Sequence, residues 1–260
     1  MIFHQASNSS SNYNFNTRFY TDTIWESHFH KNLELIYVIK GNLNCTINNV
    51  PYKMTAGDFG LCLPYDIHSY VPDAGCEYWI LVFSEDFVHS FSKEISGKTA
   101  DRCIFKVSDT VKAYIIKQLI YNETPTRYTL KSCLYAVCDE FLSSVNLIKK
   151  DRKKSEIISL IADYVSEKHT ENISLNDIAS TFCYDYNYMS RCFKNMFNMS
   201  FTNFVNLYRL ETAIRLLETT NKGMAEIAMN SGFQSVRNFN NIFIKNLNMS
   251  PSQYRKASRK

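Results

Sequence analysis

The sequence has no long hydrophobic run. No stretch approaches the roughly 18 consecutive apolar residues that a membrane-spanning helix needs, although apolar residues make up 45% of the chain. Residues 1–16 are polar and rich in serine and asparagine, and they lack a basic start followed by an apolar segment. They therefore do not resemble a secretory signal peptide. We expect a cytoplasmic protein without a membrane partner, in which residues 1–16 form a flexible tail.

Paired cysteines are also missing. The eight cysteines are scattered, and none forms the Cys-X-X-Cys pair that is common in zinc sites. Most of them lie within apolar patterns, where cysteine behaves as a small hydrophobic residue. We therefore predict reduced thiols, as is usual in the cytoplasm, and no zinc site built from cysteine.

Positive charge is concentrated in the second part of the chain. Residues 1–150 contain 14 Lys/Arg and 15 Asp/Glu, a net charge of −1, whereas residues 151–260 contain 15 and 10, a net charge of +5. A basic surplus attracts polyanions such as nucleic acids. A solvated basic surface without a partner gives the same count, so a DNA-binding function needs support from a motif.

The pattern of short strands and longer helices predicts an α+β protein with two domains. From Leu33 to Phe83 the sequence has short apolar runs broken by turn residues, such as Asn48-Asn49, which suits a tight hairpin. Strands at this spacing are typical of a barrel. We predict a cupin-like, effector-sensing barrel over residues 17–105, a helical segment over 106–148, a basic linker over 149–155 and a DNA-binding domain over 156–260.

Two amphipathic helices are expected to follow the barrel. Val111, Tyr114, Ile115 and Leu119 have helical spacing, and after Pro125 so do Leu130, Leu134, Val137, Cys138, Phe141 and Val145. Such apolar stripes have to be buried, either against the barrel itself or against a partner subunit. We favour the second alternative and expect a homodimer.

The DNA-binding region contains one pattern twice, about fifty residues apart. Asp177-Ile178-Ala179, Phe193-Lys194 and Met199-Ser200 correspond to Glu226-Ile227-Ala228, Phe243-Ile244-Lys245 and Met249-Ser250. Each copy has the periodicity of a helix, a turn and a second helix, and a long helix over about residues 202–219 joins them. This arrangement predicts two helix-turn-helix units held by a rigid connection, which suits neighbouring major-groove segments about 34 Å apart.

The polar faces of the two second helices are the candidate DNA contacts. Met189, Cys192, Phe193 and Met196 have core spacing in the first unit, as do Phe239, Ile242, Phe243 and Leu247 in the second. The opposite faces present side chains that can reach phosphates and base edges. The predicted DNA-binding residues are Asn187, Tyr188, Ser190, Arg191 and Lys194 in the first unit, and Ser235, Arg237, Asn238, Asn241 and Lys245 in the second.

Residues 155–257 closely resemble the DNA-binding domain of the AraC/XylS family of transcription regulators. The resemblance is carried by Tyr188 to Lys194, Met199-Ser200-Phe201, Arg209 to Leu217, Gly232-Phe233 and Ser250 to Arg255. It implies an all-helical domain that reads successive segments of the major groove of double-stranded DNA. The sequence departs from the family pattern at Asn198 and Asn248, where glycine is usual, at Arg237-Asn238 and at Ile244.

Histidines in the barrel region also form a pattern. His28, His30, Glu34 and Gly41, followed by Gly57, Pro64 and His68, resemble the two-part signature of cupin barrels, whose side chains bind a divalent metal ion. Sensor domains of AraC-like regulators often keep such histidines without a metal, and this second reading is the one that we favour. We therefore expect no cofactor and an effector pocket formed by Trp25, His28, His30, Glu34, Tyr37 and His68.

Together these patterns predict a regulator rather than an enzyme. A small molecule, such as a sugar or a related metabolite, would bind the barrel and change DNA binding, and an activator would also contact RNA polymerase. Two alternatives remain: a metal-dependent cupin enzyme with a DNA-binding domain, and a ligand-independent DNA-binding protein whose barrel only forms dimers.

Overall fold

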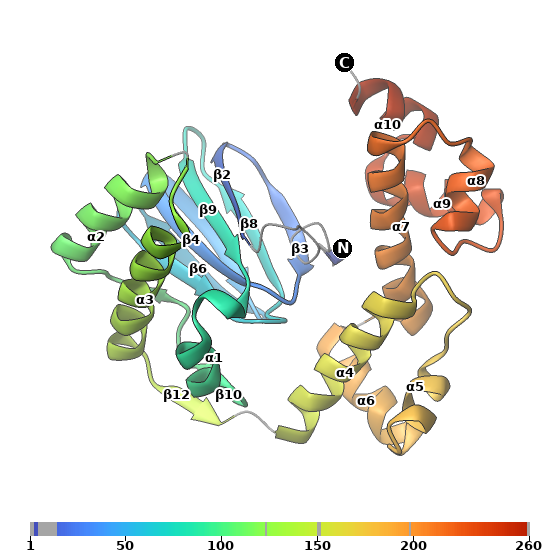
Figure 1. The fold of residues 1–260 in the computed structure, drawn as a ribbon, viewed down its shortest axis with the longest axis horizontal. Helices are drawn as coiled ribbons and strands as arrows, with labels where there is room; N and C mark the ends of the chain where they lie inside the picture. The colour runs from blue at the N-terminus through green and yellow to red at the C-terminus, as the bar shows by residue number, and fades with distance from the viewer. Residues whose placement is uncertain (1–2, 5–14, 123, 150–151, 198, 259–260) are drawn as a thin grey trace. The chain divides into compact units, whose positions relative to one another are not determined.

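The structure is a computed structural model that describes residues 3–4, 15–122, 124–149, 152–197 and 199–258 (Figure 1). The chain divides into two compact units, Met1–Arg152 and Lys153–Lys260. Most of the expected tail over residues 1–16 lies outside the described residues. Within that range, strand β1 (Phe3–His4) pairs with strand β3, and strand β2 begins at Phe15. No helix in the described ranges combines the length and the apolar character required to cross a membrane.

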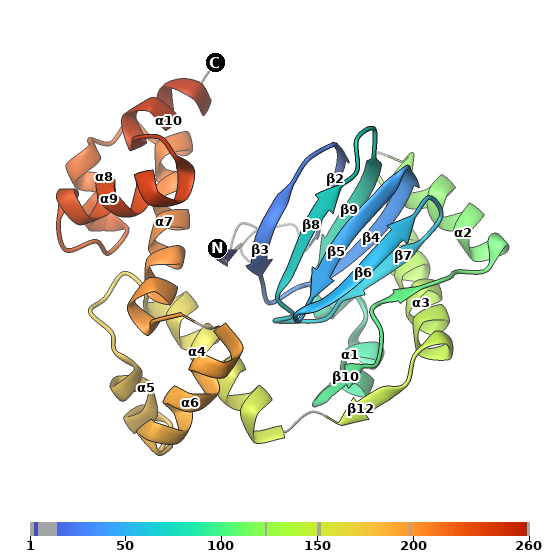
Figure 2. The ribbon, with the colours of Figure 1, turned by 180° about the vertical axis from the view of Figure 1, so that it is seen from behind.

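The first unit consists of two five-stranded sheets with helices on one side (Figures 1 and 2). Apart from the short parallel pair β1–β3, the described strands of these sheets pair antiparallel, and the β-rich, cupin-like architecture that the sequence predicts is confirmed. In order, the first sheet contains β1, β3 (Trp25–Phe29), β8 (His68–Pro72), β5 (Asn42–Ile47) and β6 (Val50–Thr55). The second contains β11 (Ile104–Phe105), β7 (Phe59–Cys62), β4 (Leu33–Lys40), β9 (Glu77–Phe83) and β2 (Phe15–Thr21).

The hairpin between β5 and β6 forms at the predicted residues. Asn48 and Asn49 have φ angles of 50° and 66°, and the adjacent Ile47 and Val50 are paired across the two strands. Positive φ at both central residues is the requirement of a type I′ turn, whose twist matches that of the strands. Asparagine tolerates this conformation better than most residues, so the local sequence fixes the register of this strand pair.

Alternation along β4 divides the apolar residues of the first unit between two cores. Ile36 and Val38 belong to a cluster between the two sheets, whereas Leu33, Leu35 and Tyr37 belong to a cluster on the opposite face. Successive side chains of a strand point to opposite faces. Glu34 therefore shares its face of the sheet with Ile36, on the side of the inter-sheet core.

Helices cover the outer face of the second sheet. They are α1 (His89–Ile95), α2 (Asp109–Ile115) and α3 (Arg127–Ser144), with a short 3-10 turn at Glu85–Phe87, a π-helical segment at Ile116–Ile120 and a small sheet of β10 (Lys98–Ala100) and β12 (Leu147–Lys149). Leu130, Leu134, Val137, Cys138 and Phe141 of α3 are buried in one cluster with sheet residues such as Leu35 and Leu81. The apolar stripe of α3 is thus covered within the same unit, as are Ile115 and Leu119 before it, whereas Tyr114 is exposed. The reason given above for a homodimer does not hold, and the homodimer stays a prediction.

The second unit is helical. It contains α4 (Arg152–Lys168), α5 (Leu175–Thr181), α6 (Tyr186–Phe197), α7 (Phe201–Thr219), α8 (Met224–Asn230), α9 (Val236–Leu247) and α10 (Pro251–Ser258). The basic segment at 149–155, expected to be a linker, instead contributes the first turn of α4 from Arg152. Lysine and arginine are good helix formers, and the buried Ile157, Ile161 and Val165 anchor the helix that they begin.

Candidate DNA-binding surface and buried histidine cluster

The first helix-turn-helix consists of α5 and α6, and its ends are fixed by local hydrogen bonds. The Ser174 hydroxyl accepts from the Asp177 N–H at 3.3 Å, and the Asp177 carboxylate accepts from the Ser174 N–H at 2.7 Å. Ser174 and Asp177 thus form a capping box at the start of α5. Cys183 turns the chain with a φ of 56°, and the Asp185 carboxylate accepts from the Tyr188 N–H at 2.8 Å at the start of α6.

The faces of α6 separate by polarity. Met189, Cys192 and Phe193 are buried, as the helical spacing predicts, together with Phe197. Of the predicted DNA contacts, Asn187, Arg191 and Lys194 are exposed, whereas Tyr188 and Ser190 are half-buried. This helix therefore presents a basic and amide-rich face that is open to a polyanion.

The second helix-turn-helix, α8 and α9, repeats this construction. Gly232 follows α8 with a φ of +85°, and the Ser235 hydroxyl caps α9 by accepting from the Asn238 N–H at 3.1 Å. Phe239 and Phe243 are buried, while the opposite face exposes Arg237, Asn241 and Lys245 and leaves Asn238 half-buried. Asn248 has the left-handed conformation expected at the end of this helix. Its counterpart Asn198 lies outside the described residues.

A surface hollow of about 710 Å³ adjoins the first polar face. It lies between α5, α6 and the start of α7, and its lining includes Ser190, Lys194 and Ser200. Ser200 caps α7 by accepting from the Asn203 N–H at 3.2 Å. Hydroxyl groups, a cationic side chain and the start of a long helix are the groups that commonly contact phosphates.

Helix α7 connects the two helix-turn-helix units (Figures 1 and 2). Near its start, Phe204 packs against Phe193 and Phe197 with ring centroids 5.2 and 4.6 Å apart. Further along, Leu210, Ala213 and Leu217 join the cluster that contains Phe239 and Phe243. Its 19 residues give a length of about 28 Å. A single helix packed on both units is the rigid connection that the sequence predicts.

Sequence reasoning missed the polar contacts that hold α7. The buried Arg209 donates hydrogen bonds to the carbonyl oxygens of His169 at 2.7 Å and Glu171 at 2.8 Å. The His169 imidazole in turn lies 2.8 Å from the Thr212 hydroxyl. These contacts join α7 to the segment after α4. From the sequence, Arg209 was identified only as part of the family resemblance, because helical spacing gives no sign of its buried acceptors.

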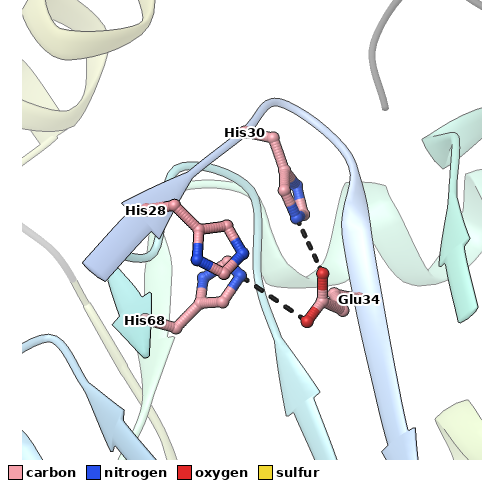
Figure 3. A group of neighbouring side chains, drawn as sticks. All are labelled: His28, His30, Glu34 and His68. Atoms are coloured by element: carbon pink, nitrogen blue, oxygen red, sulfur yellow. Dashed lines mark hydrogen bonds and ion pairs between the residues drawn. The ribbon is translucent and has the colours of Figure 1, made fainter. Parts of the chain in front are cut away.

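In the first unit, four polar side chains meet inside the protein (Figure 3). His28, His30, Glu34 and His68 are almost fully buried, and one donor atom from each lies within 4.8 Å of the others. His28 on β3 faces its cross-strand partner His68 on β8, with ring centroids 4.1 Å apart. His30 follows β3, and Glu34 lies on β4. The sequence predicted that these four residues belong together.

Hydrogen bonds fix the orientation of these side chains. The Nε2 atom of His30 lies 3.0 Å from Oε2 of Glu34, and Nε2 of His68 lies 3.6 Å from Oε1. Tyr70 donates a hydrogen bond of 2.5 Å to Oε1 of Glu34. Tyr70 was not predicted, although its place two residues after His68 on a strand puts both side chains on one face.

Burial and mutual contact shift the protonation of the cluster. Burial lowers the pKa of His28 to about 3, and the neighbouring His68 adds to this effect. Burial also opposes ionisation of Glu34, but the contacts with His68 and His30 hold its pKa well below the usual range. For His68, burial favours the neutral form, yet the Glu34 carboxylate raises its pKa above the ordinary value. The cluster thus combines an anionic carboxylate with a neutral His28.

Two aromatic residues of the predicted effector pocket lie in different places. Trp25 adjoins the cluster, with its ring centroid 5.7 Å from that of His28. Tyr37 does not lie with them: it packs against Phe59, with centroids 4.7 Å apart, in the core below the helices. The correction follows from strand alternation, because Tyr37 is three residues from Glu34 and so points to the opposite face of β4.

Comparison with known proteins identifies a family domain in each of the two units. Residues 15–134 match the model of the AraC-like ligand binding domain, and residues 178–257 match that of a helix-turn-helix domain. The uncharacterised HTH-type transcriptional regulator YdiP of Escherichia coli K12 is 25% identical over 92% of this chain and 84% of its own length. The melibiose operon regulatory protein of the same organism is 29% identical, but the match spans only 39% of this chain and 33% of that protein.

Solved structures support the fold over most of the chain. ToxT from Vibrio cholerae aligns with a TM-score of 0.64 at 17% identity, over 94% of this chain and 98% of that chain. ToxT has also been solved with an unsaturated fatty acid bound, and that structure aligns with a TM-score of 0.63 at 18% identity. At sequence identities of 17–18%, the similarity to ToxT shows a shared fold only. Since both domain models match in order and the fold agrees, the chain belongs to the AraC/XylS type of DNA-binding transcription regulator, with a ligand-binding N-terminal domain.

Proposed function

We propose that this regulator binds one specific duplex DNA site with α6 and α9 in successive major-groove segments, and that a small molecule bound by the first unit controls this binding. The main support is the repeated surface: each of these helices buries an aromatic face and exposes a basic, amide-rich face. Because its target is DNA, we place its action in the cytoplasm. We also propose that it is a regulator without enzymatic activity.

The exposed side chains divide between two tasks. Contacts to phosphates supply much of the affinity and fix the register, while contacts to base edges select the sequence. Arg191 and Arg237 are the strongest candidates for base contacts, because arginine can donate two hydrogen bonds to guanine. Lys194 and Lys245, three and eight residues further along their helices, suit phosphate contacts.

For the effector, we propose a sugar or a related small metabolite that enters near the histidine cluster. The name of one relative refers to a melibiose operon, and Trp25 offers an aromatic face beside His28. A fatty acid, as bound by ToxT, is the second candidate class. Control of DNA binding requires that the effector has different affinities for two states of the protein. A homodimer and, for activation, contact with RNA polymerase belong to the same proposal.

Genome-wide binding in cells that express the intact protein tests the DNA-binding part. The wild type should occupy a small number of sites that share a motif, and purified protein should bind these sites in gel-shift titrations more tightly than scrambled DNA at equal salt. The double variant Arg191→Ala and Arg237→Ala should lose this preference while keeping weak nonspecific binding. Equal binding of wild type and variant to the motif would contradict the proposed roles.

A metabolite panel tests the sensing part. An effector should raise the melting temperature of the purified chain and change its affinity for the motif by about fivefold or more. If no compound does either, while the protein still binds its motif, the ligand-independent alternative is favoured. Turnover of a compound by the purified protein would instead favour the enzyme alternative.

A further inference from the structure

An apolar residue, Ile244, lies on the polar face of α9. Its side chain is 48% exposed, and Arg237 and Asn241 on the same helix are also exposed. At about 100° per residue, these three side chains lie within about 60° of one another around the helix axis. The buried Phe239 and Phe243 lie on the opposite side. Ile244 therefore belongs to the face that is proposed to enter the major groove, and not to the core.

The helix holds Ile244 at a fixed place relative to the other two side chains. The Asn248 N–H donates to the Ile244 carbonyl oxygen at 2.9 Å, so Ile244 lies within regular helix. Its β-branched side chain has one strongly preferred rotamer there. Ile244 comes seven residues after Arg237, which is about 10.5 Å along the axis, or about three base pairs of about 3.4 Å each. A helix that follows the groove brings these two side chains to base pairs about three apart.

The first helix-turn-helix has a different residue at the matching position. Ile244 follows the buried Phe243 on α9, and on α6 the residue after the buried Phe193 is Lys194. Lys194 is exposed and lines the hollow beside Ser200, where a phosphate contact is expected. An isoleucine side chain has no group that binds a phosphate. Exposed apolar residues are common on protein surfaces, so the informative point is that this one takes the place of a cation on the polar face.

We propose that Ile244 contacts the C5-methyl group of a thymine, and that the half of the operator bound by α9 therefore requires a T·A pair at one position. The C5-methyl of thymine is the apolar group that a base pair presents in the major groove, and an aliphatic side chain is its natural partner. The inference rests on the proposed function, because it requires α9 to lie in the major groove.

The neighbouring side chains extend the assignment to the composition of this half-site. Arg237 suits guanine and Asn241 suits adenine, since each can form two hydrogen bonds with that base. The guanine and the thymine would lie about three base pairs apart, with the adenine between them. The matching positions of α6 carry asparagine, arginine and lysine instead. The two half-sites should therefore differ in sequence, so that the regulator binds its operator in one orientation.

Replacement of thymine by uracil removes only the methyl group and tests the contact on the wild-type protein. Each thymine of the motif that the intact chain selects is changed to deoxyuridine in turn, and fluorescence anisotropy measures the affinity at one salt concentration. At least one of these probes should bind about threefold to tenfold more weakly, since burial of one methyl group contributes a factor of this size. Equal binding of all uracil probes, with the motif still preferred to scrambled DNA, would overturn the contact and leave the proposed function standing.

Ile244→Ala assigns the methyl contact to this side chain. At one of the positions found with the wild type, this variant should bind the thymine probe and its uracil counterpart with equal affinity. Val71→Ala is the matched control, because Val71 is a β-branched residue on β8 of the first unit with the same exposed fraction of 48%. This control should keep the full preference for thymine. Circular dichroism of both variants checks that they fold as the wild type does.

The outcomes separate this inference from the proposed function. A preference for thymine that survives Ile244→Ala at every position would overturn the inference and assign the exposed isoleucine to another contact, such as one with a protein. Loss of the preference in Val71→Ala as well would also overturn it, because the effect would not be specific to α9. A wild type that binds the motif and scrambled DNA equally at the same salt concentration would overturn both proposals together.

Discussion

The Nε atom of Arg209, in the middle of the connecting helix α7, donates a hydrogen bond of 2.7 Å to the carbonyl oxygen of His169. The same guanidinium donates to the Glu171 carbonyl at 2.8 Å. Arg209 is buried, so these two bonds replace water that the charged group has lost. The contact holds the segment between α4 and α5 against α7.

Replacement of Arg209 by leucine should therefore destabilise the second unit. Two carbonyl oxygens lose their donors, and hydrogen bonds to charged groups contribute about 1.5–3 kcal/mol each. We expect the free energy of unfolding to fall by about 2–4 kcal/mol in urea denaturation followed by circular dichroism. Arg215→Ala, at an exposed position of the same helix, is the control and should change it by less than about 0.5 kcal/mol. Similar values for both variants would contradict this role of Arg209.

Gly232 should not tolerate a side chain. Its φ is +85°, and a Cβ atom would lie 2.5 Å from the Cα of Thr170 and 2.8 Å from the His169 carbonyl oxygen. Both neighbours are backbone atoms, which cannot move aside as a side chain can. Gly232→Ala is expected to lower the free energy of unfolding by at least about 3 kcal/mol. The control Gly223→Ala, where a Cβ meets nothing within 4 Å, should cost less than about 1 kcal/mol.

The two polar faces should contribute differently to operator binding. Arg191→Ala is predicted to weaken binding to the specific site by about 1–3 kcal/mol and to relax the preference at one base pair. Lys194→Ala should instead weaken binding to all sequences. It should also lower the slope of log affinity against log salt concentration by about one, which corresponds to one fewer released counterion. Fluorescence anisotropy at several salt concentrations measures both effects. The reverse pattern would exchange the roles of these two residues.

Asp58 should make the stability of the first unit depend on pH. Its Oδ2 accepts from the Thr55 N–H at 2.7 Å and from the Thr55 hydroxyl at 2.9 Å, and its Oδ1 contacts Lys106. Although burial opposes ionisation, these contacts lower the pKa of Asp58 below its usual value. A carboxylate with a lowered pKa stabilises the fold above the unfolded pKa of about 3.9, and this stabilisation is lost as the pH falls through the folded value.

Asp58→Asn should accordingly lower the free energy of unfolding by about 1–2 kcal/mol at neutral pH. The difference in this free energy from the wild type should shrink below about pH 4. Lys106→Ala is the informative comparison, because the Lys106 side chain is 76% exposed. Loss of the Lys106 side chain should lower the free energy of unfolding by less than about 1 kcal/mol. Thermal unfolding at a series of pH values provides the measurement. A difference that persists unchanged to pH 2.5 would show that ionisation of Asp58 is not responsible.

Local patterns in the sequence predicted most of the second unit. The buried and exposed faces of α6 and α9 follow from helical spacing, and the caps at Ser174 and Ser235 follow from residue type. The partners of Arg209 and the backbone contact of Gly232 lie about forty and sixty residues away. No local pattern encodes such distant contacts, so neither was predicted.

In the first unit the prediction succeeded where it depended on neighbouring residues. The spacing of His28, His30 and Glu34 indicated a shared site, and the structure places them together with His68. Tyr37 was grouped with them by residue type alone, although alternation along β4 puts it on the other face. The apolar stripes of the trailing helices were recognised, but what covers them depends on the packing of the entire unit.

Helix α7 is one uninterrupted helix, and its two ends are clamped by separate aromatic clusters. Such a connection has no hinge. The protein, and not the DNA, therefore sets the relative orientation of the two DNA-contacting helices, α6 and α9. Inserting about five base pairs between the two halves of the operator would rotate the second half to the far side of the duplex. The regulator would then bind only one half of such an operator at a time.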